Sequence, residues 1–510
     1  MDDRWTIYER HIKEISKKDV SEIVIQFSRI TQQLLKRYSR NSQKPHLFLM
    51  NETISLTGFN TNRSDNGSVS VSAADQLLIE RSHDEIVRST ALSWLHRIVA
   101  WMCTTFFLSI LMVLALFHYY YGKISGAGVH SHQSPRTPAY PNAEGKKLAR
   151  IPDLGYYLNM LNLELLEYRI KTKDGFIITL QRITDPSDRD QLNRRPPVLL
   201  VHGLLQSSGS FVTSGEKSLA VFLFRNGFDV WLGNNRCGFV PRNETLSPQD
   251  PRMWDWDVKD LAMFDLPAMV DEILKVSAFD KVSLCCHSQG TSQTFLALSE
   301  QHGSAINHKI TTFIALSPAV FRGALIHQKL FIKFIQGISD STYKWFFGVH
   351  SFMPIMLSVR GLIYKYSIFG LLSYSMFNFL FDWTDTLWDP SLRSQHFLFS
   401  PVYVSTKLMA WWLCSQTGGF GSEECILDET QSWFDPARTP PIMLVIPLED
   451  RLVDGEKLKT HMRLNEPRIS TTILEIEKYA HLDVLWADDV IEKVGYPILE
   501  HLNMCVRNSL

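Results

Sequence analysis

The sequence has 510 residues, of which 45% are hydrophobic and 21% are charged. This is the composition of a globular protein with room for one large catalytic domain and accessory segments, so disorder throughout is excluded. The 52 Lys and Arg residues balance the 53 Asp and Glu residues, and the formal net charge of -1 argues against nucleic acid as a partner. Seven irregularly spaced cysteines suit neither a disulfide scaffold nor a zinc site with paired C-x-x-C ligands, and we expect no metal and no cofactor. Cys414 and Cys425 could bridge a loop or remain free thiols.

Residues 1–97 form an N-terminal extension. Apolar residues recur in its first part at steps of three and four, which predicts one or two amphipathic helices: Trp5, Tyr8, Ile12, Ile15, Val20, Val24, Phe27, Ile30 and Leu34. Residues 41–74 are rich in Ser, Asn and Thr without clear periodicity, and this composition is typical of a linker.

Residues 98–121 (IVAWMCTTFFLSILMVLALFHYYY) contain no Asp, Glu, Lys or Arg. About 20 such residues suffice to cross the hydrocarbon core of a bilayer. Trp101 and the three tyrosines at 119–121 are placed as interfacial anchors, and Arg97 and Lys123 bracket the run. The segment therefore predicts a single transmembrane helix, with a buried core helix as the alternative. A Gly-, Ser-, Pro- and His-rich linker follows it over residues 122–150.

The orientation of this helix rests on a small difference in charge. Arg81, Arg88 and Arg97 precede it, against Lys123 and Arg136 after it, and the side richer in Lys and Arg tends to stay cytosolic. We therefore expect a catalytic domain on the luminal or extracellular side, with glycosylation at the sequon 243–245 and not at those beginning at residues 51, 62 and 66. The opposite orientation, or a seat on a lipid-droplet monolayer, would place the catalytic domain in the cytosol. An endomembrane, the plasma membrane and a lipid droplet all remain open as locations.

The catalytic body, residues 151–510, alternates predicted strands and helices. Short apolar runs at 198–201, 229–232 and 282–285 are typical of buried parallel strands, and helical patterns at 218–226 and 257–276 separate them. Two further strands are predicted at 442–445 and 472–476. This rhythm indicates an α/β fold with a parallel sheet, in which functional residues lie at the carboxyl ends of the strands.

Ser288 stands in the setting of a nucleophile elbow. The sequence CHSQG (286–290) directly follows the third predicted strand and directly precedes a predicted helix over 291–300. In such elbows a strained strand-to-helix turn lifts the serine hydroxyl above the sheet, usually within G-x-S-x-G. Cys286 replaces the first glycine of that pattern. The context predicts that Ser288 is a catalytic nucleophile.

A serine hydroxyl needs a base, and the base needs an acid that orients it. α/β-Hydrolases present these residues in the chain order Ser, Asp or Glu, His. Asp450 follows the strand at 442–445, and His481 follows the next strand, so both are predicted to reach Ser288. Glu449 and Asp454 compete with Asp450, although a solvated or turn-capping role suits them better.

Two backbone N–H groups are expected to stabilise the oxyanion of the reaction. Gln289, the residue after the nucleophile, supplies one, and Leu204, in the loop after the first predicted strand, supplies the other. Gly203 allows the backbone of that loop to approach closely. His202 and His287 are better explained by structural or packing roles than by catalysis.

A cap is predicted at about residues 320–430, between the elbow and Asp450. The segment 366–381 (YSIFGLLSYSMFNFLF) and the pair Trp411 and Trp412 make it dense in apolar side chains. Arg360 and Lys365 argue against a second transmembrane span here. This much apolar surface beside the site favours a hydrophobic substrate.

The body resembles the acid lipase family, which includes gastric and lysosomal lipases and membrane-anchored fungal steryl ester hydrolases. The resemblance covers about residues 151–502 and rests on the elbow together with motifs that occur in order: KDGFIITLQRI (173–183), DVWLGNNR (229–236), WDWDVKDLAMFDLPAMVD (254–271) and AHLDVLWADD (480–489). It implies an α/β-hydrolase fold with a helical cap, the triad Ser288, Asp450 and His481, and oxyanion donors at Leu204 and Gln289. An N-terminal anchor without a secretory signal is similar to the fungal steryl ester hydrolases.

The expected activity is hydrolysis of neutral lipid esters through an acyl-enzyme, with steryl esters as the leading substrate and triacylglycerol as the alternative. A membrane or lipid-droplet surface is the expected partner. A hypothesis of another class is an inert, membrane-tethered lipid-binding module, which the departure at Cys286 keeps open.

Overall fold

The computed structural model describes residues 90–125, 139–140, 148–187, 193–302, 306–415, 417–423 and 425–509, all within one compact unit, Val71–Leu510. The predicted amphipathic helices, the linker at 41–74, most of the linker at 122–150 and the three N-terminal sequons lie outside the described residues.

Eight strands form one sheet in the order β1-β2-β4-β3-β5-β6-β7-β8. β1 and β2 pair antiparallel, as do β2 and β4, and the other neighbours pair parallel. The strands are β1 (Glu164–Lys171), β2 (Ile177–Thr184), β3 (Pro197–Val201), β4 (Asp229–Gly233), β5 (Val282–His287), β6 (Ile310–Leu316), β7 (Ile442–Pro447) and β8 (Thr471–Ile476). This sheet confirms the predicted α/β-hydrolase fold, with β1, β2 and β6 added to the predicted strands.

The central strands read as unbroken apolar runs because both faces of the sheet are covered. Successive side chains point to opposite faces. A hydrophobic core therefore lies on each face of the sheet. Leu199 and Cys286 point into the first core, and Leu200 and Cys285 point into the second core. Apart from α3 (Thr90–Ile124), the described α-helices outside the cap are α4 (Leu154–Asn159), α5 (Leu219–Arg225), α6 (Val258–Asp260), α7 (Leu266–Val276), α8 (Gln289–Leu298), α16 (Gly455–Leu464), α17 (Asp483–Trp486) and α18 (Tyr496–Ser509).

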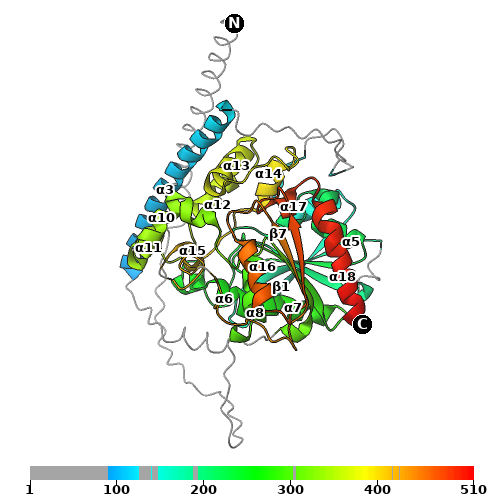
Figure 1. Cartoon of the computed structure of the whole chain (residues 1–510). Coiled ribbons are helices and arrows are strands. Elements are labelled where there is room, and N and C mark those ends of the chain that lie inside the picture. The colour runs from blue at the N-terminus through cyan, green and yellow to red at the C-terminus, as the bar shows by residue number, and fades with distance from the viewer. Residues whose placement is uncertain are drawn as a thin grey trace, which may run out of the picture. The chain divides into compact units, whose positions relative to one another are not determined.

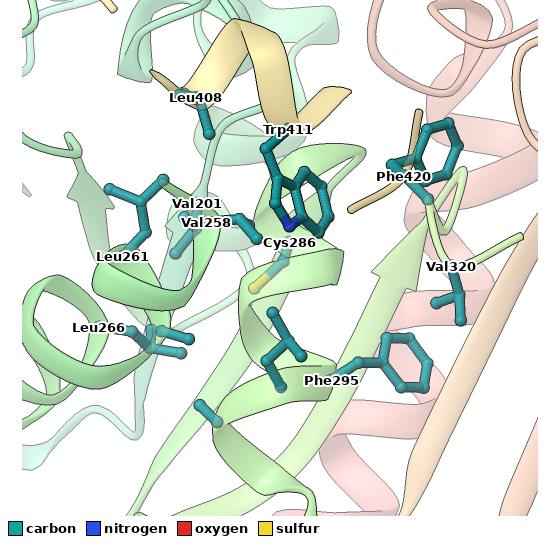
Figure 2. Packing of buried hydrophobic residues seen from close by; sticks show 14 of the residues in the cluster. Val201, Val258, Leu261, Leu266, Cys286, Phe295, Val320, Leu408, Trp411 and Phe420 are labelled. Carbon is teal, nitrogen blue, oxygen red and sulfur yellow. The ribbon is translucent and has the colours of Figure 1, made fainter. Parts of the chain in front are cut away.

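Cys286 is part of the first core. Figure 2 shows it among Val258, Leu261 and Trp411, and its Sγ lies 3.3 Å from Oγ1 of Thr294 on α8. Burial raises the pKa of the Cys286 thiol to about 12, so the group is an uncharged packing side chain near neutral pH. The core thus accommodates a cysteine where the usual motif has glycine.

In the described residues between β6 and β7, seven α-helices form the cap: α9 (Ala324–Gln328), α10 (Leu330–Gly337), α11 (Asp340–Phe347), α12 (Ile355–Ile363), α13 (Ile368–Phe381), α14 (Arg393–His396) and α15 (Thr406–Leu413). The cap is tied to the body through buried tryptophans. Trp411 packs into the first core, and Trp388 packs into the second.

The apolar run lies in α3 (Thr90–Ile124), which is longer than the predicted 98–121. Residues 96–124 are long and apolar enough to cross a membrane, and 22% of their most apolar window is buried. Cap helices α11, α12 and α13 contact α3, and Figure 1 shows it beside α10, α11 and α13. Its buried positions, Ala100, Thr104, Leu111 and Ala115, recur at helical spacing, so one face packs on the cap.

Three of the sequence motifs meet in one buried ion cluster. Arg236, at the end of DVWLGNNR, pairs with Asp174 of KDGFIITLQRI at 2.7 Å and with Asp265 of WDWDVKDLAMFDLPAMVD at 2.6 Å. All three side chains are almost fully buried, and the Arg236 guanidinium also lies over the Phe176 ring. Buried charges persist when they are paired and hydrogen-bonded, so these motifs fix the end of β4 beside the site.

Two further predictions concern the cysteine pair and the sequon at 243–245. Cys414 and Cys425 are both free. The Asn243 Nδ2 atom, to which a glycan would be attached, is buried in the folded body. The orientation of the catalytic domain stays a prediction.

Candidate active site

Ser288 joins β5 to α8 in a left-handed backbone conformation, with φ 51° and ψ -117°. Such a conformation is strained for a residue with a side chain and is typical of a nucleophile elbow. The Ser288 N–H donates to the Leu316 carbonyl at 3.0 Å. A Cβ at Gly290 would lie 2.6 Å from the Val201 carbonyl oxygen, which explains the small residue where α8 begins.

The structure brings Ser288, His481 and Asp450 into one hydrogen-bonded chain. His481 Nε2 lies 2.8 Å from Ser288 Oγ, and His481 Nδ1 lies 2.6 Å from Asp450 Oδ2. The Asp450 side chain and the His481 side chain are each 2% exposed. Asp450 Oδ1 also accepts hydrogen bonds from the N–H groups of Leu452 and Val453. The carboxylate is therefore fixed on both oxygens and holds the imidazole with Nε2 toward the serine.

The competing residues have other roles. Asp454 accepts a hydrogen bond from the Lys457 N–H and caps α16, and Glu449 is exposed. His202 is buried, which lowers the pKa of its imidazole to about 4, and its Nε2 accepts the Asn235 N–H. These three side chains are outside the Ser288 chain of hydrogen bonds.

His287 supports the loop that carries His481. Its Nε2 donates to the His481 carbonyl at 3.1 Å, and its ring lies 5.1 Å from the His481 ring. Burial, together with the neighbouring His481, holds the pKa of His287 well below its usual range, so its imidazole is neutral. Ser317 Oγ donates to the same carbonyl at 3.0 Å. His287 thus fixes the backbone of His481 from the residue next to the serine.

The two predicted oxyanion donors lie at the edges of the same site. A Cβ at Gly203 would lie 3.0 Å from Ser288 Cβ, so the loop that carries Leu204 passes directly over the serine. Gln289 opens α8, where the first N–H groups have no partner within the helix. Within the described part of the chain, neither the Leu204 N–H nor the Gln289 N–H donates a hydrogen bond. The Gln289 side chain is anchored by the cap, because Trp412 Nε1 donates to its Oε1 at 2.9 Å.

The sequence did not reveal two residues that hold His481. Trp383 of the cap stacks on the His481 imidazole with ring centroids 5.3 Å apart and planes 6° apart. Asp483 accepts a hydrogen bond from the Ala480 N–H and another from Trp388 Nε1, both at 2.7 Å. Trp383 follows an apolar run in which nothing in the sequence points to His481 as its partner, whereas Asp483 is part of the family motif AHLDVLWADD (480–489).

Ser288 and His481 open into a cavity of about 1740 Å³, a volume that includes its open mouth. The wall is almost wholly apolar and contains no carboxylate. Most of it comes from the cap, including Phe331, Met356, Leu372, Met376 and Leu380, and one side comes from α3. No group of three or more metal-ligating side chains gathers anywhere in the part of the chain that the structure describes.

The sheet and the buried Ser–His–Asp chain define an α/β-hydrolase. Family models agree: residues 154–215 match the partial alpha/beta-hydrolase lipase region, and residues 196–349 match the alpha/beta hydrolase fold.

Similarity to individual proteins identifies the family within this fold. The chain is 40% identical over 396 residues to Sterol esterase 2 of Saccharomyces cerevisiae, covering 71% of this chain and 73% of that protein. It is 29% identical over 356 residues to a probable lipase of Schizosaccharomyces pombe, covering 67% and 75% respectively. It is 28% identical over 360 residues to human gastric triacylglycerol lipase, covering 66% and 87%. The chain therefore belongs to the acid lipase family of α/β-hydrolases, as predicted, and is a carboxylic ester hydrolase.

The pH dependence of stability tests the environment of Asp483. Burial raises the pKa of this carboxyl group to about 7, although two donors favour the ionised form. The folded state therefore retains a proton that the unfolded chain loses near pH 4, so stability falls as the pH rises from about 4 to 7. Asn cannot ionise. We expect the free energy of unfolding of Asp483→Asn, relative to wild type, to improve by on the order of 2 kcal/mol between pH 5 and pH 8. Urea unfolding at both pH values measures it, and a constant difference would show that Asp483 ionises normally.

Proposed function

We propose that this enzyme hydrolyses steryl esters to sterol and fatty acid, with Ser288 as nucleophile, His481 as general base and acid, and Asp450 as the orienting carboxylate. The observation that carries this proposal is the Ser288–His481–Asp450 chain, whose serine and histidine line a carboxylate-free apolar cavity. The likeness to a sterol esterase supports the choice of substrate.

In the first half of the reaction, Ser288 Oγ attacks the ester carbonyl carbon while His481 Nε2 accepts the hydroxyl proton. Asp450 stabilises the resulting imidazolium, and the stacked Trp383 ring contributes a cation–π interaction. The carbonyl oxygen becomes an oxyanion that accepts hydrogen bonds from the Leu204 and Gln289 N–H groups. When this intermediate collapses, the bond to the sterol oxygen breaks, and His481 donates its proton to that oxygen. The acyl group remains on Ser288.

In the second half, a water molecule takes the place of the sterol. His481 Nε2 accepts a proton from the water as its oxygen attacks the acyl carbon. The same two N–H groups stabilise the second oxyanion. Its collapse breaks the bond to Ser288 Oγ, which recovers the proton from His481, and the fatty acid leaves. No step requires a cofactor.

The cavity favours a substrate with two large apolar parts. An ester bound at Ser288 must place its acyl chain and its alcohol on different sides of the reacting carbon, and a sterol is a rigid apolar alcohol. The wall is built largely from flexible Met and Leu side chains and from aromatic rings, which adapt to such bodies. Arg360 is the charged residue that lines the cavity; its guanidinium lies over the Phe239 ring, and its Nε donates to the Leu398 carbonyl.

We further propose that the enzyme works at a membrane or lipid-droplet surface, with α3 as its anchor and the face of α3 that points away from the cap in contact with lipid. From Met102 to Tyr120, the side of α3 that faces away from the cap exposes the apolar side chains Met102, Phe106, Ile110, Val113, Phe117 and Tyr120. Soluble monomers rarely expose an apolar surface of this extent. Exposed Phe334 and Trp345 continue the surface onto the cap.

The Ser288→Ala change tests the nucleophile. Ester hydrolysis should fall by roughly 10³-fold or more, because no acyl-enzyme can form. A fluorophosphonate probe should label the wild type and not the variant; an unlabelled wild type would indicate an inert lipid-binding module. His481→Ala and Asp450→Asn should also be severe. Asp454→Asn is the matched control, and a larger loss there than in Asp450→Asn would reverse the carboxylate assignment.

A panel of esters tests the substrate. The detergent-purified full chain receives cholesteryl oleate, ergosteryl oleate and triolein in the same mixed micelles, with Ser288→Ala as the blank. We expect kcat/KM for at least one steryl ester to exceed that for triolein by tenfold or more. Faster cleavage of triolein would make the enzyme a triacylglycerol lipase with the same mechanism.

Lysines on the outer face of α3 test the anchor. Val113 and Phe117 are 66% and 71% exposed, and two lysines there each cost about 2.5–3.5 kcal/mol in hydrocarbon. The double change Val113→Lys and Phe117→Lys should move the protein from the carbonate-washed membrane pellet to the supernatant. Leu464→Lys, at an apolar side chain on α16 that is 72% exposed, should leave it in the pellet. A double variant that stays in the pellet would contradict the proposed anchor.

A further inference from the structure

The helix that we assign to the membrane also reaches the active site. Phe107, Leu108, Leu111 and Met112, one and a half turns of α3, line the same cavity as Ser288 and His481. These residues are on the helix face that packs on the cap, in line with buried Thr104 and Ala115. The cavity wall thus combines a segment before residue 125 with a cap that begins some 200 residues later in the sequence.

Contacts along α3 hold this face in position. At its start, His96 Nε2 lies 3.0 Å from the Lys344 carbonyl oxygen. In the middle, the Phe107 ring lies 5.8 Å from the Phe347 ring and 6.3 Å from the Phe334 ring. Near its end, the Tyr119 ring lies 6.0 Å from the Tyr374 ring of α13. The four cavity-lining residues lie between the first and the last of these attachments, and Phe107 is itself the middle one.

We infer that α3 is a wall of the substrate site and determines which esters enter it, with Leu108 and its three neighbours in contact with the hydrocarbon of the bound lipid. This rests on the proposed function of the Ser288 site and adds to it. One face of α3 meets the lipid layer and the opposite face meets the cavity. A neutral ester can therefore pass from the lipid along the edge of α3 to Ser288 without its apolar parts entering water.

A pair of identical substitutions on opposite faces of α3 tests the wall. Leu108→Trp adds bulk inside the cavity, whereas Leu114→Trp makes the same change on the outer face, where Leu114 is 45% exposed. In the full chain, Leu108→Trp should lower kcat/KM for cholesteryl oleate at least tenfold and change that for soluble p-nitrophenyl butyrate less than twofold. Leu114→Trp should change neither by more than twofold. An unchanged cholesteryl oleate rate in Leu108→Trp would overturn the inference.

A second measurement keeps the test valid if Leu108→Trp misfolds. Leu108→Cys and Leu114→Cys are alkylated with a maleimide before and after Ser288 has reacted with a long-chain alkyl phosphonate, with the native chain as background for Cys103. The bound chain should slow alkylation at position 108 at least fivefold and leave position 114 unchanged. Equal rates before and after would overturn the inference.

These experiments distinguish a failure of the inference about α3 from a failure of the proposed function. If triolein proves the better substrate, the comparison of Leu108→Trp with Leu114→Trp is repeated with triolein, and the same contrast is expected. If the phosphonate does not react with Ser288 at all, the proposed function fails, whereas reaction without protection of position 108 contradicts only the wall.

Discussion

The left-handed turn at Ser288 is the constraint on which the rest of the site depends. A strand must end and a helix must begin within one residue, so β3, β5 and α8 come close enough that a Cβ at Gly290 would collide with the Val201 carbonyl. The strain is held by hydrogen bonds from the start of α8. Thr291 Oγ1 donates to the Ser288 carbonyl and accepts the Ala319 N–H, and Ser292 Oγ donates to the Ala319 carbonyl. These bonds join the elbow to the chain just after β6 and so place the serine relative to the neighbouring strands.

The cap contacts residues of the candidate active site as well as covering it. Three cap tryptophans reach residues of the site: Trp383 stacks on His481, Trp412 anchors the Gln289 side chain, and Trp388 donates to Asp483. Each has a large apolar ring that packs in the cap, and two of the three use the indole N–H on a residue of the body. A movement of the cap would therefore disturb the imidazole, the oxyanion region and the His481 loop together. The geometry of the site and the shape of the cavity are coupled for this reason.

The sequence predicted the residues that lie at strand ends and missed those that meet only in three dimensions. Ser288, Asp450 and His481 each follow an apolar run, and parallel strands bring such loops to one edge of the sheet. β6 was not predicted, although it is fully buried, because no catalytic motif follows it in the sequence. β1 was not predicted because charged residues alternate with its apolar ones, so it lacks the continuous apolar run of a buried parallel strand. It is an antiparallel strand at the edge of the sheet. No local sequence pattern around Trp383 or Leu108 indicates that the first contacts His481 or that the second lines the cavity. Only the folded structure shows these contacts.

The position of α3 matters because of the cost of moving a neutral ester through water. Exposing hydrocarbon costs about 0.8 kcal/mol per CH2, so a chain of some 16 methylenes would cost roughly 13 kcal/mol, or about nine orders of magnitude in population. A soluble catalytic domain at the end of a linker would face that cost at every turnover, even with an ideal Ser288 site. A cavity whose wall is itself in contact with the lipid avoids most of it. With α3 inserted in lipid as proposed, its packing on the cap would give the anchor a catalytic consequence: the ester would reach the serine without crossing a layer of water.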